Sequence, residues 1–418
     1  MDKLIISGNK KLKGSINVHG AKNAALPIFV SSLLSDKNLI LKNAPKVDDI
    51  NNMLMLLRGY GAKVIKNKNS LTLNCMNIKN ISADYDIVRK MRASVLILGP
   101  LLSRFGYSKI SLPGGCAIGT RPINIHLEGL NKLGANFKIE NGFIIGNVKN
   151  KLKGNKIKLP FPSVGATENI LMASVLAKGE TIIDQAAREP EIEDLGNCLI
   201  SMGAKIQGLG TKKILIQGVD SLKEAKHTII SDRIVAGTYI ILAIMLNCKF
   251  EIKNFNPYHL ISLIDVLKNM GCNLELLDRS IKIYPSKKLK STNVVTAPYP
   301  GFPTDLQAQL MALMSIVNGN SQIKETVFEN RFMHVPELVR LGANIKLSKD
   351  KALIKGNQNF KGAQVMASDL RASVSLVLAA LCAEGETVIN RVYHLDRGYE
   401  KIEESIGKLG LKIKRVKD

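Results

Sequence analysis

The chain has 418 residues, of which 45% are apolar and 22% are charged, and its formal net charge at pH 7 is +24. This length predicts two or three domains with ample apolar cores. The longest apolar runs, such as residues 239–246, are far shorter than the ~20 residues that cross a bilayer. The N-terminal residues do not form a signal peptide, so we expect a cytoplasmic protein that does not bind membranes.

The positive charge does not favour a nucleic-acid-binding function. Lysines are spread along the chain instead of clustered, and only nine Tyr, eleven Phe and no Trp are present to stack on bases. Local positive charge is better explained by small anionic substrates.

The cysteines and histidines show no spacing typical of metal ligands, so we expect no metal site. Five of the six cysteines lie outside glycine-rich sequence and mostly in apolar segments, which is typical of buried thiols in a reducing compartment. Cys116 is the exception, because glycines surround it.

Taken in chain order, the sequence repeats one unit six times, with a spacing near 70 residues. Each unit contains a helix that is apolar nearly all round and a later amphipathic helix, followed by hairpin-like sequence. The apolar helices are expected at 23–34, 93–102, 165–176, 234–246, 306–317 and 372–382. The amphipathic helices end at glycines, which is the C-terminal helix signal: Gly61, Gly134, Gly203, Gly271, Gly342 and Gly410. Each unit is therefore expected to run strand, buried helix, strand, surface helix, hairpin, and the units to group as three plus three.

Charged residues precede the helices of several units. Asp and Ser at such places are often simple N-caps. Arginine at a helix start opposes the helix dipole and does not favour stability, so its recurrence indicates a site for a ligand with several negative charges. These basic residues are Lys46, Arg121, Arg188, Arg331 and Arg397.

A glycine-rich loop at 112–122 carries Cys116, with Arg121 five residues later. Its glycines and prolines are incompatible with a regular helix or strand. A thiol near a guanidinium ionises more readily, and such a thiol serves as an acid or a nucleophile. The alternative is an ordinary surface loop that happens to contain a cysteine.

With these residues in view, the whole chain resembles the UDP-N-acetylglucosamine 1-carboxyvinyltransferases, which are enolpyruvyl transferases of peptidoglycan synthesis. The motifs that carry the resemblance lie at 19–27, 91–94, 112–122, 163–167, 187–192, 302–305, 329–332, 369–373 and 396–399.

The resemblance implies an α/β fold with two domains, each an inside-out α/β barrel of three βαβαββ repeats. One domain would comprise residues 22–229 and carry the Cys116 loop. The other would combine residues 1–21 with 230–418, and the active site would lie in the cleft between the two domains.

The resemblance also implies a reaction. The enolpyruvyl group of phosphoenolpyruvate would pass to the 3′-hydroxyl of UDP-N-acetylglucosamine, with release of phosphate, through a tetrahedral intermediate and without a cofactor. In the cell this is the first committed step of peptidoglycan synthesis and thus of cell-wall biogenesis, with effects on cell shape and division.

The family's residue roles transfer by matching motif. Cys116 would be the general acid at the methylene carbon and would form covalent adducts with a pyruvate-derived group or with fosfomycin. Asp305 would be the base for the hydroxyl, with Asp369 assisting proton transfer. Residues for phosphoenolpyruvate would be Lys22, Asn23, Arg121, Arg331, Arg371 and Arg397. Those for the UDP-sugar would be Asn23, Arg92, Arg121, Pro122, Ile123, Asn124, Ile125, Ser163, Val164, Gly165, Asp305 and Val327.

Three positions depart from the family pattern: Asn124 in place of an aspartate, Phe161 near a position where some members have lysine, and Val235 in place of a glutamate. Three alternatives stay open. The sister transferase that acts on shikimate 3-phosphate lacks this cysteine loop and typically has Ser-Lys-Ser where this chain has Ala21-Lys22-Asn23. The others are an inactive relative that senses UDP-sugar and a basic nucleic-acid-binding repeat protein. The sequence does not indicate an oligomeric state.

Overall fold

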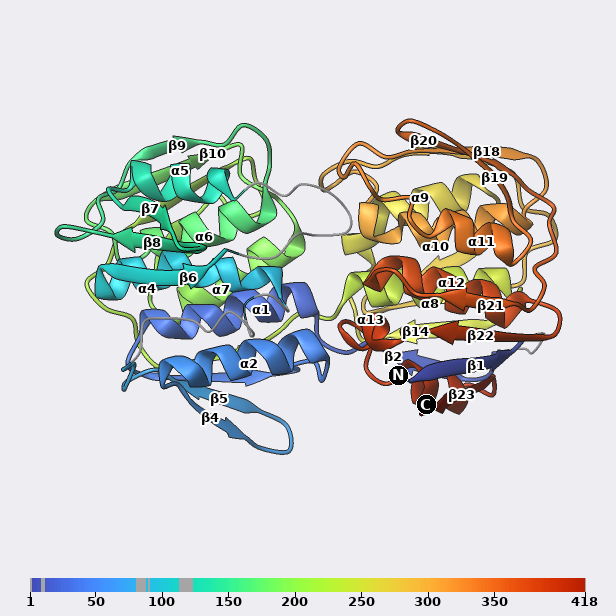
Figure 1. Ribbon diagram of the computed structural model, residues 1–418, viewed down its shortest axis with the longest axis horizontal. Helices are drawn as coiled ribbons and strands as arrows, with labels where there is room; N and C mark the ends of the chain where they lie inside the picture. The colour runs from blue at the N-terminus through green and yellow to red at the C-terminus, as the bar shows by residue number, and fades with distance from the viewer. Residues whose placement is uncertain (1, 9–11, 80–87, 89–90, 113–122, 418) are drawn as a thin grey trace. The chain divides into compact units, whose positions relative to one another are not determined.

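The computed structural model describes residues 2–8, 12–79, 88, 91–112 and 123–417, and these form two compact units. The first unit combines residues up to His19 with Ser231–Asp418, and the second contains Gly20 to Ile230. Figure 1 shows the helices of each unit lying between its β-sheets. The chain passes twice from one unit to the other, so the first unit is built from both ends of the sequence.

The second unit contains three successive repeats. The first consists of α1 (Lys22–Ser31), η1 (Ser32–Leu34), β3 (Asn38–Lys42), α2 (Asp48–Tyr60), β4 (Lys63–Lys66) and β5 (Leu71–Asn74). The second consists of η2 (Arg92–Ile97), α4 (Leu98–Phe105), β6 (Tyr107–Ser111), α5 (Asn124–Lys132), β7 (Asn136–Glu140) and β8 (Phe143–Asn147). The third consists of β9 (Lys156–Lys158), α6 (Val164–Ser174), β10 (Glu180–Asp184), α7 (Pro190–Ser201), β11 (Lys205–Gln207) and β12 (Lys213–Gln217), and β13 (Ala225–Thr228) follows it.

The first unit repeats the same order. Its opening repeat consists of β2 (Ser15–Asn17), α8 (Arg233–Met245), β14 (Phe250–Lys253), η3 (Pro257–Leu260), α9 (Ile261–Asn269), β15 (Asn273–Leu276) and β16 (Ser280–Tyr284). The next consists of β17 (Asn293–Val295), η4 (Thr304–Leu306), α10 (Gln307–Ile316), β18 (Asn320–Lys324), α11 (Val335–Arg340), β19 (Asn344–Ser348) and β20 (Lys351–Lys355). The last consists of β21 (Gln364–Met366), α12 (Leu370–Cys382), β22 (Glu386–Asn390), α13 (Tyr393–Asp396), α14 (Ile402–Lys408), β23 (Lys412–Val416) and β1 (Lys3–Ser7).

Every repeat builds its own small sheet with one strand order. In the third repeat of the second unit, β9 lies parallel to β10, which pairs antiparallel with β12, which pairs antiparallel with β11. Among the described residues, five such sheets have four strands, and the sheet of β6, β8 and β7 has three.

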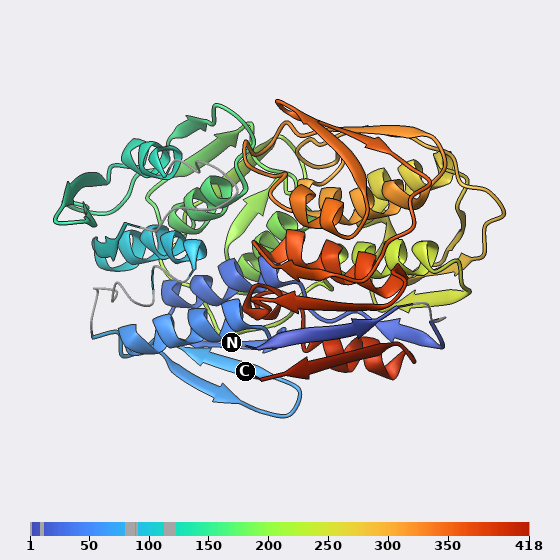
Figure 2. The ribbon, with the colours of Figure 1, turned by 45° about the vertical axis from the view of Figure 1, so that its right-hand side comes forward.

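Strands from the start of the chain complete sheets formed by its end. β1 lies between β22 and β23 and is antiparallel to both, while β2 lies parallel to β14. In Figure 2, β1 (blue) lies beside the C-terminal strand β23 (dark red). Similarly, β13 lies parallel to β3 and closes the first sheet of the second unit. Long-range pairing of this kind fixes the two chain ends on the same unit.

The apolar helices predicted from the sequence are confirmed as the centres of the two cores. Helices α8, α10 and α12 pack on one another in the first unit, and α4 and α6 pack on each other and near α1 in the second. Figure 1 shows these helices in the middle layer of each unit. The six predicted helix-ending glycines all have positive φ, from 88° to 106°, a conformation that favours glycine.

Two other predictions concern membranes and cysteines. No helix within the described ranges is both long enough and apolar enough to cross a bilayer. Cys75, Cys198, Cys248 and Cys272 are buried as expected, whereas Cys382 is partly exposed. Burial raises the pKa of the Cys75, Cys198 and Cys272 thiols, which is typical of structural and unreactive cysteines.

Candidate functional site

Site residues predicted in the second unit lie at the starts of its helices. They are Lys22 and Asn23 in the first turn of α1, Arg92 at the start of η2, Ile123, Asn124 and Ile125 at the start of α5, and Ser163, Val164 and Gly165 at the start of α6. Helix starts present backbone N–H groups that have no partner within the helix, and they attract anions. One unit therefore gathers several anion-attracting helix ends.

Three of these helix starts come close together around His126. This side chain is only 8% exposed, and the Arg92 guanidinium acts on its charge. The ring also lies against Gly165: a Cβ added at Gly165 would lie 3.1 Å from the imidazole Cε1 and 3.3 Å from Nε2. The starts of η2, α5 and α6 therefore surround one imidazole that the sequence motifs did not assign.

Lys22 has a buried counter-ion that the sequence analysis missed. Its Nζ donates to Asp49 Oδ2 at 3.0 Å, and the two residues are 8% and 2% exposed. Asp49 lies in the first turn of α2, where an acidic residue is explained equally well by the helix dipole. No local signal therefore distinguished it as a partner of Lys22.

In the first unit, Asp305 lies in η4 between two buried arginines. Arg331 Nη2 is 2.6 Å from Oδ1 and Arg371 Nη2 is 3.0 Å from Oδ2. The arginines are 5% and 4% exposed. Burial opposes the positive charge of Arg371, but Asp305 favours that charge, with smaller effects of Tyr399 and Asp232, and the pKa of Arg371 is raised. Arg371 therefore remains charged although it is buried.

Two predicted site residues at helix starts, Asp369 and Ser163, are also N-caps, which is the alternative role that the sequence analysis gave for Asp and Ser at such places. Asp369 Oδ1 accepts from the backbone N–H groups of Arg371 and Ala372 at the start of α12. Asp232 caps α8 and Ser163 caps α6 in the same manner. Asp305, in contrast, lies inside η4, and its carboxylate contacts Arg331 and Arg371.

Asp369 and Arg397 lie near two histidines with lowered pKa values. Burial lowers the pKa of His334 and His394, with Arg331 contributing at His334 and Arg397 at His394, while Asp369 opposes both shifts. Arg397 follows α13 and is half-buried. The end of α13 and the start of α12 therefore belong to one charged neighbourhood.

Glu325 connects two predicted site segments and was not identified from the sequence. Its carboxylate accepts from Thr304 Oγ1, next to Asp305, at 2.8 Å and from the N–H of Val327, also at 2.8 Å. Gln309 Nε2 in turn donates to the backbone carbonyl of Asp305 at 3.0 Å. These contacts position Asp305 and the backbone at Val327, but no motif marks them.

The remaining predicted residues, Cys116, Arg121 and Pro122, lie outside the described residues. Among the described residues, no group of three or more His, Cys, Asp or Glu side chains is arranged to hold a metal ion.

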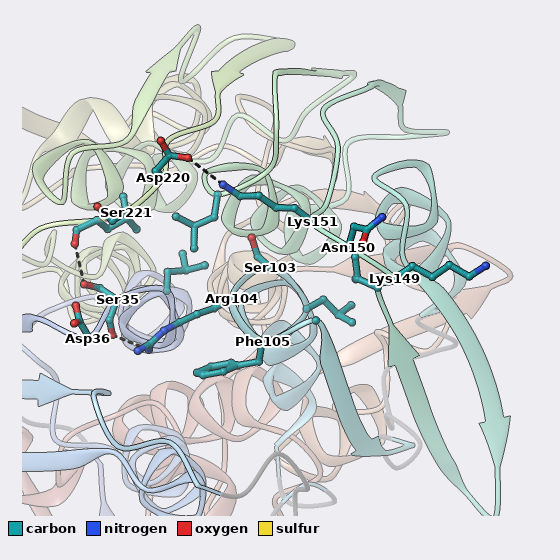
Figure 3. A pocket seen from close by; sticks show the side chains of 16 residues that line it. Ser35, Asp36, Ser103, Arg104, Phe105, Lys149, Asn150, Lys151, Asp220 and Ser221 are labelled. Carbon is teal, nitrogen blue, oxygen red and sulfur yellow. Dashed lines mark hydrogen bonds and ion pairs between the residues drawn. The ribbon is translucent and has the colours of Figure 1, made fainter.

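A pocket of about 780 Å³ lies at the opposite ends of the buried helices of the second unit. It is lined by the ends of η1 and α4 and by Lys149, Lys151 and Asp220, among others (Figure 3). Arg104 Nη1 donates to the carbonyl oxygens of Leu33, Ser35 and Cys75 at 3.0, 2.9 and 2.9 Å. Because helix C-termini leave carbonyl groups unpaired, this contact is structural, and none of the predicted site residues lines the pocket.

Comparison with known proteins gives a consistent assignment. Residues 6–406 match the family described as EPSP synthase (3-phosphoshikimate 1-carboxyvinyltransferase). A UDP-N-acetylglucosamine 1-carboxyvinyltransferase 2 of Mesorhizobium japonicum is 51% identical over 416 residues, with both chains fully covered. The UDP-N-acetylglucosamine 1-carboxyvinyltransferase of Paramagnetospirillum magneticum is 50% identical over 428 residues, covering 100% of this chain and 99% of that protein.

Solved structures share the fold at lower identity. The enolpyruvyl transferase NikO from Streptomyces tendae superimposes with a TM-score of 0.90 at 23% identity over 99% of both chains. An EPSP synthase from Acinetobacter baumannii superimposes with a TM-score of 0.78 at 20% identity over both full chains. The predicted enolpyruvyl transferase fold is thereby confirmed. Together with the full-length relatives, these matches establish that the chain belongs to the EPSP synthase family of enolpyruvyl transferases, within the group of UDP-N-acetylglucosamine 1-carboxyvinyltransferases.

Proposed function

We propose that this protein transfers the enolpyruvyl group of phosphoenolpyruvate to the 3′-hydroxyl of UDP-N-acetylglucosamine and releases phosphate. The main support is the 51% identity, over the full length of both chains, to a relative that bears the name of this activity. The acid–base and cationic side chains gathered at the helix starts fit the needs of the reaction.

Phosphoenolpyruvate carries a phosphate and a carboxylate, and the proposal assigns cationic side chains to both. Lys22, Arg121 and Arg397 bind the substrate, and Arg331 and Arg371 lie next to the reacting hydroxyl beside Asp305. Arginine suits this role because its planar donors match the oxygen pairs of carboxylates and phosphates.

Two proton transfers accompany addition. Asp305 accepts the proton of the sugar hydroxyl while the hydroxyl oxygen forms a bond to C2 of phosphoenolpyruvate. The C2=C3 electron pair takes a proton from Cys116, which converts the methylene to a methyl group. In the elimination that follows, a methyl proton passes to the Cys116 thiolate, the double bond forms again, and phosphate leaves with the electron pair of its C2–O bond. Asp369 assists proton transfer, and the proposed reaction needs no cofactor.

The UDP-sugar is assigned to the helix starts of the second unit together with Asp305 and Val327 of the first. The diphosphate is suited to N–H groups at the start of α6, where Ser163 and Gly165 lie. Asn23 and Asp305 then contact the sugar, so the proposal requires that both units act on one substrate. Asn124, an amide in place of an aspartate, remains able to hydrogen-bond the uracil.

The proposed reaction supplies the first committed step of peptidoglycan synthesis, from substrates that occur in the cytoplasm. We therefore place the protein in the cytoplasm, acting on small molecules and not on nucleic acid.

A phosphate-release assay tests this function. Purified protein with phosphoenolpyruvate should release phosphate when UDP-N-acetylglucosamine is added and not when shikimate 3-phosphate is added. The family that matches residues 6–406 is named for the second substrate, so the assay with shikimate 3-phosphate tests the main competing activity. Release with shikimate 3-phosphate alone would contradict the proposal, and salt-sensitive retention on DNA together with no release would favour the nucleic-acid alternative.

A further inference from the structure

We propose that His126 is a neutral hydrogen-bond donor of the UDP-sugar site, acting through Nε2–H, and that Asn169 selects this tautomer. The proposal rests on the proposed function and adds a binding residue and a positioning residue to it. The acceptor would be an oxygen of the diphosphate bound at the start of α6.

The orientation of the Asn169 amide is fixed by its backbone partners. The Gly99 N–H donates to Asn169 Oδ1 at 2.7 Å. A backbone N–H only donates, so the atom facing it is the amide oxygen. The amide nitrogen, Nδ2, therefore faces the other way, where it donates to the Val95 carbonyl at 3.0 Å and lies 3.2 Å from His126 Nδ1.

This orientation determines where the imidazole carries its proton. Since Asn169 Nδ2 carries hydrogens, His126 Nδ1 has to present its lone pair to accept one of them. The ring proton is consequently on Nε2. A second proton on Nδ1 would point at the amide hydrogens, so the contact also disfavours the imidazolium. Burial and the Arg92 charge act in the same direction and lower the pKa of His126 to about 4.

The Nε2 edge of the ring faces the first turn of α6. It lies 3.3 Å from where a Cβ of Gly165 would be, and this turn follows the N-cap Ser163. Within the described residues, Nε2 has no hydrogen-bond partner, although the residue is only 8% exposed. The free edge of a largely buried ring, the N–H groups at the start of an 11-residue helix and the Arg92 charge thus converge on one place.

The chemistry of this arrangement suits a diphosphate. A neutral donor adds a hydrogen bond to an anion without placing a second cation beside Arg92, and without changing charge at neutral pH. The absence of a side chain at Gly165 leaves the space in which the ligand oxygen approaches both the ring edge and the helix start.

Two substitutions separate the donor from the rest of the ring. In His126→Gln the side-chain amide reaches the position of Nε2 and retains a donor, whereas in His126→Asn it reaches only the position of Nδ1. We expect His126→Asn to weaken UDP-N-acetylglucosamine binding, measured by calorimetry, by about 10-fold or more, as for loss of a hydrogen bond to a charged group. The affinity of His126→Gln for UDP-N-acetylglucosamine should remain within about threefold of the wild-type value, because the donor is retained. The KM for phosphoenolpyruvate should change little in either variant.

The tautomer is observed directly by ¹H–¹⁵N NMR of the imidazole, with His126→Gln identifying the resonances. Wild type should show a neutral ring protonated on Nε2. Asn169→Asp removes the hydrogens that face Nδ1, so the ring should become protonated at Nδ1, with weaker UDP-sugar binding while thermal unfolding is still cooperative.

Several outcomes would overturn the proposal: wild-type affinity in His126→Asn, Nδ1 protonation in the wild-type ring, or equal losses of both substrate affinities and of stability in both His126 variants. Failure of the proposed function would be distinct, because wild-type protein would then bind no UDP-N-acetylglucosamine at all.

Discussion

At the scale of single residues, Asp305 has two competing tasks. Its carboxylate neutralises Arg331 and Arg371 through contacts of 2.6 and 3.0 Å, and in the proposed mechanism it also accepts the hydroxyl proton. A carboxylate that binds two arginines is a weak base, because both cations stabilise its charged form. An arriving substrate anion that draws the arginines away would make Asp305 more basic.

Replacing this carboxylate by an amide tests the role as base. Asp305→Asn preserves shape and contact with the sugar but cannot accept a proton, so turnover should fall roughly 10²-fold or more. UDP-N-acetylglucosamine binding, measured by calorimetry, should remain near normal. Turnover close to wild type would remove Asp305 from this role.

The same variant should bind inorganic phosphate more tightly than wild type. Asp305→Asn removes the anion that competes for Arg331 and Arg371, so phosphate affinity should rise on the order of 10-fold. Calorimetry without nucleotide measures this affinity, and Asp265→Asn at an exposed position of α9 controls for the change in net charge. Equal affinities in all three proteins would show that these arginines do not contact the phosphate.

Cys116 offers a residue-scale test of the acid. Its reference pKa of about 8.5 compares with about 3.9 for aspartic acid, so Cys116→Asp should work best at lower pH than wild type. Fosfomycin should add its mass to wild-type protein but not to Cys116→Asp, since a carboxylate is a weaker nucleophile than a thiolate. Cys116→Ser should lose most turnover. The pH–rate profiles and intact-protein mass spectrometry check these outcomes. Full turnover in Cys116→Ser would contradict the role of Cys116 as the general acid.

At the scale of elements, the buried helices have two chemically different ends. Predicted site residues lie at their starts, where N–H groups attract anions, while Arg104 satisfies carbonyl groups near the opposite ends in the second unit. Function and stability are therefore expected to separate along the helix axis.

Arg104→Met tests this separation. The substitution retains the length of the side chain but removes three hydrogen bonds to backbone carbonyls, so the free energy of unfolding should fall by about 2–3 kcal/mol. The KM values should change little because the affected end is remote from the predicted site residues. Urea unfolding followed by circular dichroism measures the loss, with Arg58→Met on the exposed side of α2 as a control. A loss of equal size in both variants would contradict the proposed role of Arg104.

At the scale of the whole molecule, stability should depend on pH through buried groups of opposite effect. His126 has a pKa of about 4 in the folded protein and about 6.5 when unfolded, so the unfolded chain binds more protons between these values. Its contribution to stability is therefore lost as pH falls from 6.5 towards 4. Glu168 acts in the other direction, because burial, then Glu191 and Glu189, raise its pKa well above the ordinary value.

Comparison with His126→Gln isolates the histidine. The slope of unfolding free energy against pH, between pH 4.5 and 6, should be smaller in the variant by up to about 1.4 kcal/mol per pH unit. Urea titrations at several pH values give this slope. Identical slopes would mean that His126 titrates in the folded protein as it does in the unfolded chain.

Local features of the sequence predicted much of the fold. A glycine directly after an amphipathic helix is a local signal, because it reflects the φ angle of one residue. All six predicted helix-ending glycines adopt the expected conformation. The buried helices were also predicted from the sequence, because a helix that is buried on all sides has to be apolar on all sides. The sequence also carried the motif residues Lys22, Asp305 and Arg371, because the residue type alone identifies a cation or a carboxylate.

Only the tertiary structure decided which of these residues meet. The pairing of Lys22 with Asp49, of Asp305 with Arg331 and Arg371, and of Asn169 with His126 joins segments far apart in the sequence, and no local spacing encodes such contacts. The same holds for β1, which completes the sheet of β22 and β23 at the far end of the chain. The physical reason is that backbone conformation depends on near neighbours in sequence, whereas charge pairing, tautomer and strand partners depend on which surfaces packing brings together.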